Sequence, residues 1–184
     1  MLINPATKPL YPSYLTIPMW KEIAAMLAEK PERLVVARFI VEHGLRISGE
    51  KIYCGQVEIP SKKIADALKV DRRTVGRTAR MLYENPKLKD IFTNMQPTFS
   101  LKRIAKFLGL GVIEIFVQDA SKPGIIAACS KVIAEEDVSI RQAFADDPEL
   151  SPEVKLTIIT ESPVPGTVYE KLHKLPFVEH VSIY

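Results

Sequence analysis

The second half of the 184-residue chain alternates between segments with strand-like and helix-like patterns of apolar residues. Ile113 and Ile115 alternate with other residues as in a strand, whereas Ile125, Cys129 and Ile133 recur at the spacing of one helix face. The segments follow the order strand, helix, strand, strand, helix, strand, at residues 112–117, 123–134, 138–145, 154–160, 166–175 and 177–183. This order predicts a ferredoxin-like sandwich, in which four antiparallel strands carry two helices on one face.

The first half of the chain has mainly helical patterns. Prolines are dense in residues 1–18 and predict an extended arm, because proline interrupts helices. A short strand is expected over 52–59, with a bend at Gly55. This strand favours, as one alternative, a helical domain that also carries a β-hairpin wing. No hairpin pattern follows residue 84. The helices that we expect span residues 19–29, 31–43, 61–68, 72–84 and 90–92, and a short helix over 101–108 follows them.

Charge is unevenly distributed between the two halves. Residues 1–100 contain 16 lysine and arginine residues against 10 aspartate and glutamate residues, whereas residues 101–184 contain 9 against 12. A basic half joined to an acidic half suggests two modules with different partners.

Four arginines share one face of the helix that Asp71 is expected to cap. At ~100° per residue they fall within an arc of about 140°. They are Arg72, Arg73, Arg77 and Arg80. The apolar side chains of the same helix fall on the other side: Val75, Ala79 and Leu82. The preceding helix, with Ser61 at its start as a cap, offers an apolar stripe to that side: Ile64, Ala65 and Leu68.

Two short helices joined by a tight turn, with arginines on the free face of the second helix, are typical of a DNA-binding helix-turn-helix. Arginine suits such a surface because its guanidinium forms two parallel hydrogen bonds with guanine or phosphate. The alternative is a solvated arginine face that only keeps the protein soluble. We expect contacts with DNA at Arg72, Arg73, Thr74, Arg77, Arg80, Lys62 and Lys63.

Residues 64–75 resemble the helix-turn-helix families of DNA-binding proteins. The chain differs from their usual pattern at Lys69, where glycine is usual in the turn, and at Thr78, where an aliphatic residue is usual. RNA is a weaker alternative to duplex DNA, because no aromatic platform for stacking bases lies among the basic residues.

The loop between the first strand and the first helix of the second half has the pattern Asp119-x-x-x-Pro123-Gly124. Proline fixes the start of the helix, and glycine frees an amide at the positive end, which attracts a carboxylate. Together with the strand 138–142 and the βαββαβ order, this loop resembles the ACT domain, a regulatory module that commonly senses amino acids. The resemblance covers residues 111–184 and implies ligand contacts at Asp119, Ser121, Pro123, Gly124, Ile125 and Ser139.

In the ACT family, ligands lie between two paired domains, which implies a homodimer or a higher homo-oligomer. The family's amino-acid binders often have asparagine where this chain has Ser121 and Ser139. Because a serine reaches less far and offers one donor, an ACT fold used only for dimerisation is the alternative.

A helix-turn-helix joined to a C-terminal ACT domain resembles a family of predicted transcriptional regulators of amino-acid metabolism. The resemblance implies a DNA-binding domain with an N-terminal arm over residues 1–92, a linker with a short helix over 93–110 and an ACT domain over 111–184. The partners that it implies are double-stranded DNA and a small-molecule effector, an amino acid. The alternative is a regulatory subunit or scaffold that does not bind DNA and whose ACT domain senses a metabolite or only dimerises.

Catalytic and metal-binding patterns are absent from the sequence. His43, His173 and His180 are scattered and have no partner at metal-site spacing. Neither a P-loop nor a G-x-G-x-x-G pattern occurs. We therefore expect a protein that is not an enzyme and needs neither a metal nor another cofactor.

The sequence also indicates where the protein works. The two cysteines, Cys54 and Cys129, lack the spacing of a disulfide framework or a zinc site. No apolar run reaches the ~18 residues of a membrane span, and no secretory signal is visible. We expect a cytoplasmic protein without a membrane partner.

Overall fold

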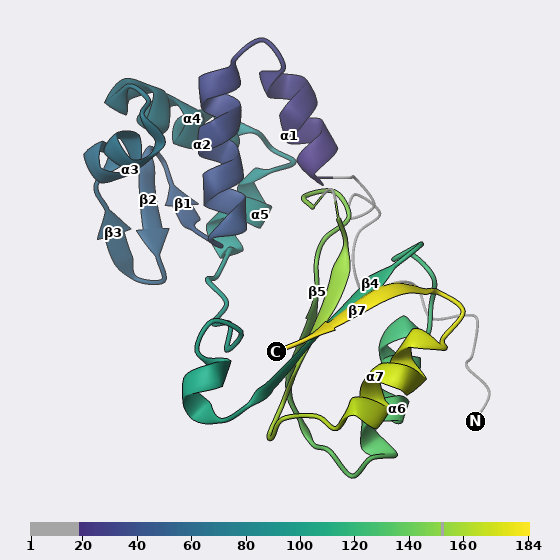
Figure 1. Cartoon of the computed structure of the whole chain (residues 1–184). Coiled ribbons are helices and arrows are strands. Elements are labelled where there is room, and N and C mark those ends of the chain that lie inside the picture. The colour runs from purple at the N-terminus through teal and green to yellow at the C-terminus, as the bar shows by residue number, and fades with distance from the viewer. Residues whose placement is uncertain (1–18, 152) are drawn as a thin grey trace, which may run out of the picture. The chain divides into compact units, whose positions relative to one another are not determined.

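The computed structural model describes residues 19–151 and 153–184 (Figure 1). The chain divides into two compact units: the first ends at Thr98 and the second spans Phe99–Tyr184. The boundary falls within the segment 93–110 that we expected to be a linker. The arm expected at residues 1–18 lies outside the described residues.

Helices dominate the described part of the first unit. Their buried faces supply large apolar side chains to one core, among them Ile23, Ile40, Ile64, Leu82 and Phe92, each at most 2% exposed. The helices are α1 (Met19–Leu27), α2 (Pro31–Glu42), α3 (Ser61–Leu68), α4 (Arg72–Glu84) and α5 (Lys89–Asn94). The helical segments predicted for this half are confirmed, with ends that move by a few residues.

A three-stranded antiparallel sheet precedes α3, and here the single strand expected over 52–59 is wrong. The strands are β1 (Arg46–Ser48), β2 (Lys51–Cys54) and β3 (Val57–Ile59), in the order β1-β2-β3. Gly55 has a φ of +58°, which lets the chain reverse between the paired residues Cys54 and Val57 instead of bending. In the described part of this unit no strand follows α4, so the hairpins stand before the two helices.

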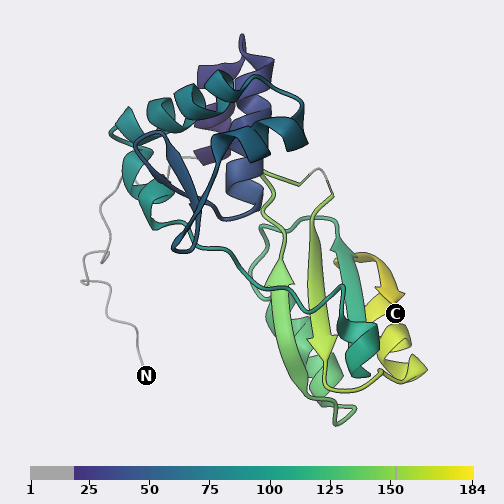
Figure 2. The same ribbon diagram turned by 90° about the vertical axis from the view of Figure 1, so that its left-hand side faces the viewer.

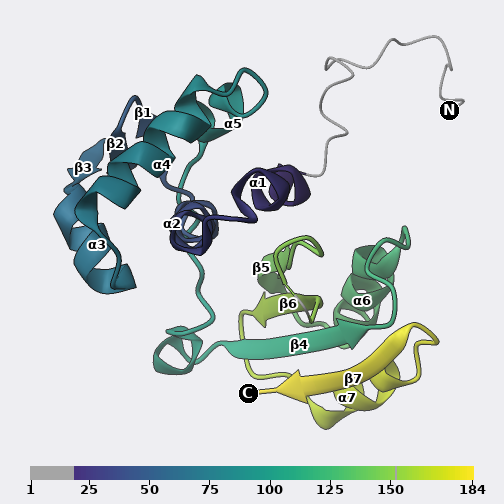
Figure 3. The same cartoon turned by 90° about the horizontal axis from the view of Figure 1, so that it is seen from above.

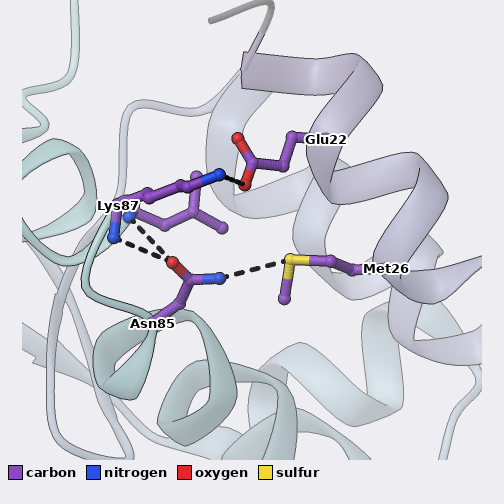
Figure 4. A network of polar contacts seen from close by, with 5 residues as sticks. Glu22, Met26, Asn85 and Lys87 are labelled. Atoms are coloured by element: carbon purple, nitrogen blue, oxygen red, sulfur yellow. Dashed lines mark hydrogen bonds and ion pairs between the residues drawn. The ribbon is translucent and has the colours of Figure 1, made fainter. Parts of the chain in front are cut away.

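Asn85 organises the break between α4 and α5 (Figure 4). Its Oδ1 accepts hydrogen bonds from the backbone N–H groups of Lys87 at 2.9 Å and Leu88 at 3.3 Å, and its Nδ2 lies 3.3 Å from Met26 Sδ. Lys87 Nζ lies 3.3 Å from Glu22 Oε1 on α1. These contacts confirm the predicted interruption at Asn85-Pro86 and join it to α1.

The second unit confirms the predicted ferredoxin-like fold. Its elements are β4 (Gly111–Val117), α6 (Ile125–Ala134), β5 (Ile140–Ala145), β6 (Lys155–Thr160), α7 (Gly166–His173) and β7 (Val178–Ile183). The strands pair antiparallel in the order β5-β6-β4-β7 (Figure 3). Helices α6 and α7 cover one face of the sheet (Figure 1). The core on that face includes Ile113, Ile115, Ile158, Cys129, Ile133, Val168 and Leu172.

The other face of the sheet is partly covered by residues that precede β4 (Figure 2). Ala105 and Leu110 are buried against Val112 and Ile159. The short helix expected over 101–108 is reduced to a 3₁₀ helix, η2 (Ala105–Leu108). Ala105 and Leu110 therefore belong to the core of the second unit, whereas Phe107 between them is exposed.

Candidate nucleic-acid groove and ligand loop

The two faces expected on α4 are present in the structure. The buried residues of the helix are Val75, Thr78, Ala79 and Leu82, whereas the four arginines Arg72, Arg73, Arg77 and Arg80 are exposed. Helix α3 contributes the buried residues Ile64 and Ala65 to the same core. The arginine face is therefore held from behind by apolar packing.

Thr78, where the helix-turn-helix families usually have an aliphatic residue, is fully buried. Its Oγ1 donates a 2.8 Å hydrogen bond to the carbonyl of Thr74, one turn earlier in α4. A buried hydroxyl that is hydrogen-bonded avoids most of the cost of leaving water. The polar residue is therefore compatible with the packed face.

The turn between α3 and α4 is tight although it lacks glycine. Lys69 takes the left-handed conformation, with φ 55° and ψ 44°, and the N–H of Val70 donates to the carbonyl of Ala65 at 3.1 Å. Asp71 Oδ1 then accepts from the N–H of Arg73 at 2.6 Å, which confirms the predicted cap of α4. Ser61 was also expected to cap a helix, but Pro60 occupies the cap position of α3 and makes no side-chain cap bond.

A groove of about 510 Å³ lies where α3 and α4 begin. It brings together four of the basic side chains that were predicted to contact DNA, namely Lys62, Arg72, Arg73 and Arg77. The first N–H groups of a helix have no partner within the helix and carry a partial positive charge. The groove therefore combines side-chain cations with two positive helix ends, an arrangement that attracts phosphate.

Three other predicted residues lie elsewhere. Arg80 Nη2 is 2.6 Å from Glu50 Oε1, and the hydroxyl of Thr74 is 3.4 Å from Glu32 Oε2 on α2. Lys63 is exposed and does not line the groove. Sequence reasoning missed the two carboxylates of the groove, Glu50 and Glu58, because only the folded hairpins bring them to α4.

The loop between β4 and α6 contains a compact turn. Asp119 Oδ1 accepts from Ser121 twice, from Oγ at 2.5 Å and from the N–H at 3.0 Å. These hydrogen bonds, the side-chain one first, lower the pKa of the Asp119 carboxyl. Gly124 has a φ of +94° and is the N-cap, so α6 begins at Ile125 rather than at Pro123 as predicted. Because the left-handed conformation of Gly124 is not helical, Pro123 before it lies in the loop and cannot be the first helical residue.

A mainly apolar cavity of about 540 Å³ lies beside this loop. Of the residues predicted to bind a ligand, Pro123, Gly124 and Ile125 line it, and Asp119 and Ser121 do not. The cavity also includes Lys122 and Lys155. The other lining residues are Val117, Ala120, Ile126, Ala127, Ala145, Val154 and Leu156.

Ser139 is not part of this cavity within one chain. Its carbonyl accepts from the N–H of Glu161 at 3.0 Å, just before β5 starts beside Thr160. The cavity instead borders the opposite end of the sheet, where Ala145 pairs with Leu156. The resemblance to ACT domains pointed to the start of β5, whereas the register places the end of β5 beside the loop.

Among the described residues, no group of three or more histidine, cysteine, aspartate or glutamate side chains is arranged to hold a metal ion. The helices in the same residues are too short or too polar to cross a membrane.

The sequence matches no known family model, and no match is found among curated proteins. The solved structures with weak similarity to this chain include the following three. The ACT domain of a GTP pyrophosphokinase from Chlorobium tepidum is 20% identical, with a TM-score of 0.33, over 41% of this chain and 96% of that one. A homoserine dehydrogenase from Thiobacillus denitrificans is 12% identical, with a TM-score of 0.32, over 61% of this chain and 27% of the dehydrogenase.

The third structure is a transcriptional regulatory protein of the ASNC family from Pyrococcus furiosus. It is 13% identical, with a TM-score of 0.28, over 91% of this chain and 87% of the regulator. With scores this low, the ferredoxin-like assignment depends on the strand order and pairing of the chain itself.

Proposed function

We propose that this protein is a transcription regulator that binds duplex DNA through α3 and α4 and senses a small molecule through its second unit. The observation that carries the proposal is the groove in which Lys62, Arg72, Arg73 and Arg77 meet. The three arginines on α4 can reach base edges when this helix enters the major groove, and Lys62 on α3 can neutralise phosphate beside them. No catalytic reaction is part of this function.

The second unit offers the features of a site for a small amphipathic carboxylate. The apolar walls of its cavity suit an aliphatic side chain, and Lys122 and the start of α6 suit a carboxylate. An amino acid combines these two groups. We propose an amino acid as the effector and association of two copies through the second unit as the means by which it alters DNA binding.

Replacement of Arg72, Arg73 and Arg77 by alanine tests the DNA interface. Loss of three phosphate or base contacts should lower affinity for duplex DNA about tenfold or more at low salt and lower the salt slope by about 2–3. The matched control replaces Lys21, Lys30 and Arg33, which lie outside the groove, and should change the affinity by less than about threefold. Unchanged duplex binding by the groove variant would contradict the proposal.

The effector is tested by screening the twenty amino acids for a rise in melting temperature. A ligand at 100 times its Kd stabilises the folded state by about 2.7 kcal/mol. Lys122→Ala should reduce the rise caused by an active amino acid, whereas Lys131→Ala, which removes an exposed charge from the last turn of α6, should not. A melting temperature raised by an amino acid in a protein that shows no salt-dependent duplex binding would favour the regulatory scaffold instead.

A further inference from the structure

Glu50 brings a carboxylate to the arginine face of α4. It lies at the turn between β1 and β2, and its Oε1 is 2.6 Å from Arg80 Nη2. Both side chains are about half exposed, at 49% and 58%, so the ion pair contributes little to folding. Because Glu50 also lines the proposed DNA-binding groove, its charge acts mainly on what binds there.

The second oxygen of Glu50 lies near α4 at Gly76. A Cβ atom at Gly76 would be 3.9 Å from Glu50 Oε2, so this oxygen sits beside the helix where it has no side chain. Glu50 lines the same groove as Arg72, Arg73 and Arg77. The carboxylate is therefore within the surface that would meet DNA.

A carboxylate at this place is unfavourable for phosphate alone. A negative charge a few ångströms from a bound phosphate repels it, which weakens binding to every sequence equally. In the major groove, by contrast, a carboxylate oxygen accepts a hydrogen bond from the amino group of cytosine. Guanine and thymine offer no amino donor there, and adenine has an acceptor beside its amino group that repels a carboxylate. A carboxylate thus favours discrimination between sequences at the expense of overall affinity.

We propose that Glu50 is a specificity-determining residue of the DNA interface, a role that rests on the proposed function. Oε1 holds Arg80 in place, and Oε2 accepts from the amino group of a cytosine in the major groove. Phosphate at this position is disfavoured, which lowers affinity for unrelated sequences. The sheet before α3 thereby takes part in recognition through its first turn.

The test compares the full chain with its Glu50→Ala and Glu50→Gln variants. A preferred duplex is first selected from a random pool with the unchanged protein, and the Kd of each protein is then measured for that duplex and for a scrambled one. Glu50→Ala should bind the scrambled duplex about threefold to tenfold more tightly, because a repulsive charge is lost. It should lower the ratio of the two affinities at least about fivefold, because a base contact is lost.

Glu50→Gln removes the charge but keeps an oxygen acceptor, so it should bind the scrambled duplex more tightly and lose less of the discrimination. The matched control is Glu42→Ala, which removes a carboxylate 2.7 Å from Arg38 on α2 and outside the groove. It should change neither affinity by more than about twofold. The melting temperatures of all variants should stay within about 5 °C of the unchanged protein, because the pairs are exposed.

Two results separate this proposal from the proposed function. If the unchanged protein discriminates and Glu50→Ala discriminates equally well, the role of Glu50 is overturned while DNA binding stands. If the unchanged protein binds both duplexes equally, the role of Glu50 is also overturned while DNA binding stands. If it binds neither in a salt-dependent manner, the proposed function fails and the role of Glu50 fails with it.

Discussion

Lys102 Nζ lies 2.7 Å from Glu114 Oε1 and so joins the segment before the second sheet to the middle of β4. The same oxygen is 2.9 Å from Lys155 Nζ on β6, and the Glu114 side chain is only 5% exposed. Burial alone would raise the pKa of Glu114, but the hydrogen bonds and charges of the two lysines outweigh it, so the pKa is lowered. The buried carboxylate of Glu114 thus forms ion pairs that connect β4 to Lys102 in the preceding segment and to Lys155 on β6.

The lowered pKa makes the second unit sensitive to acid. A carboxyl whose pKa is lower in the folded state stabilises that state above its unfolded pKa, which is about 4.3 for glutamate. This stability is lost as the pH falls through the folded pKa. Glu114→Gln should destabilise the second unit at pH 7 by about 2 kcal/mol, because two lysines lose a charged partner, and should weaken the loss of stability between about pH 5 and pH 3. Urea unfolding followed by far-UV circular dichroism measures both effects.

The control for this variant is Glu161→Gln in the same unit. Glu161 lies 3.2 Å from Arg141, and both side chains are about half exposed. Glu161→Gln should lower the free energy of unfolding by less than about 1 kcal/mol. Equal losses of stability for the two variants would mean that the buried ion pairs of Glu114 stabilise the unit no more than an exposed pair does.

The strained turn between α3 and α4 leads to a second prediction. A side chain in the left-handed region costs about 1–2 kcal/mol, and Lys69 has a φ of 55°. Lys69→Gly should therefore stabilise the first unit by about 1 kcal/mol, after the greater freedom of glycine in the unfolded chain is subtracted. The fluorescence of Trp20, the single tryptophan, reports unfolding of this unit in urea.

Lys69→Ala is the matched control, because it removes the same charge and keeps a Cβ atom. Its stability should stay within about 0.5 kcal/mol of the unchanged protein. A gain as large as that of Lys69→Gly would attribute the effect to charge instead of backbone conformation.

The βαββαβ fold of the second unit could be predicted because each element carries its own periodicity. Ile113 and Ile115 alternate on β4, and Cys129 and Ile133 recur one turn apart on α6, and each of these residues is buried in the same core. The apolar pattern did not predict the three strands within residues 46–59, because strands of three or four residues are too short to show an alternation.

The candidate sites were less predictable than the fold. The arginine face followed from helix geometry, because Arg72, Arg73 and Arg77 belong to one element. The pairing of Arg80 with Glu50 depends on a hairpin 30 residues earlier, and no local pattern encodes that contact. Ser139 shows the same limit, because strand register decides which end of β5 borders the ligand loop.

The two cysteines should differ sharply in reactivity. Cys129 is fully buried in the core of the second unit, and burial raises the pKa of its thiol to about 11. The thiolate is the reactive form, so at pH 8 Cys129 should not react in the folded protein. Cys54 is exposed on β2 and should react. A chromogenic disulfide reagent should titrate one thiol per folded chain and two after denaturation.

Cys54→Ser is the control for this assignment. It should abolish the reaction of the folded protein and leave one thiol after denaturation. Reaction of the folded Cys54→Ser protein at the rate of a free thiol would show that the core around Cys129 opens readily.

Among the glycines of the first unit, Gly44 leaves the least room for a side chain. It follows α2 with a φ of +57°, and a Cβ atom there would collide with the backbone carbonyl of Gln96. Gly55 has nearly the same φ, +58°, but nothing lies within 4 Å of its added Cβ. Both alanine variants incur the left-handed strain of about 1 kcal/mol, and only Gly44→Ala must also displace the chain after α5. Trp20 fluorescence in urea should show losses of about 3 kcal/mol or more for Gly44→Ala and about 1 kcal/mol for Gly55→Ala. Equal losses would mean that the segment carrying Gln96 moves aside without cost, and that its contact with the end of α2 does not stabilise the unit.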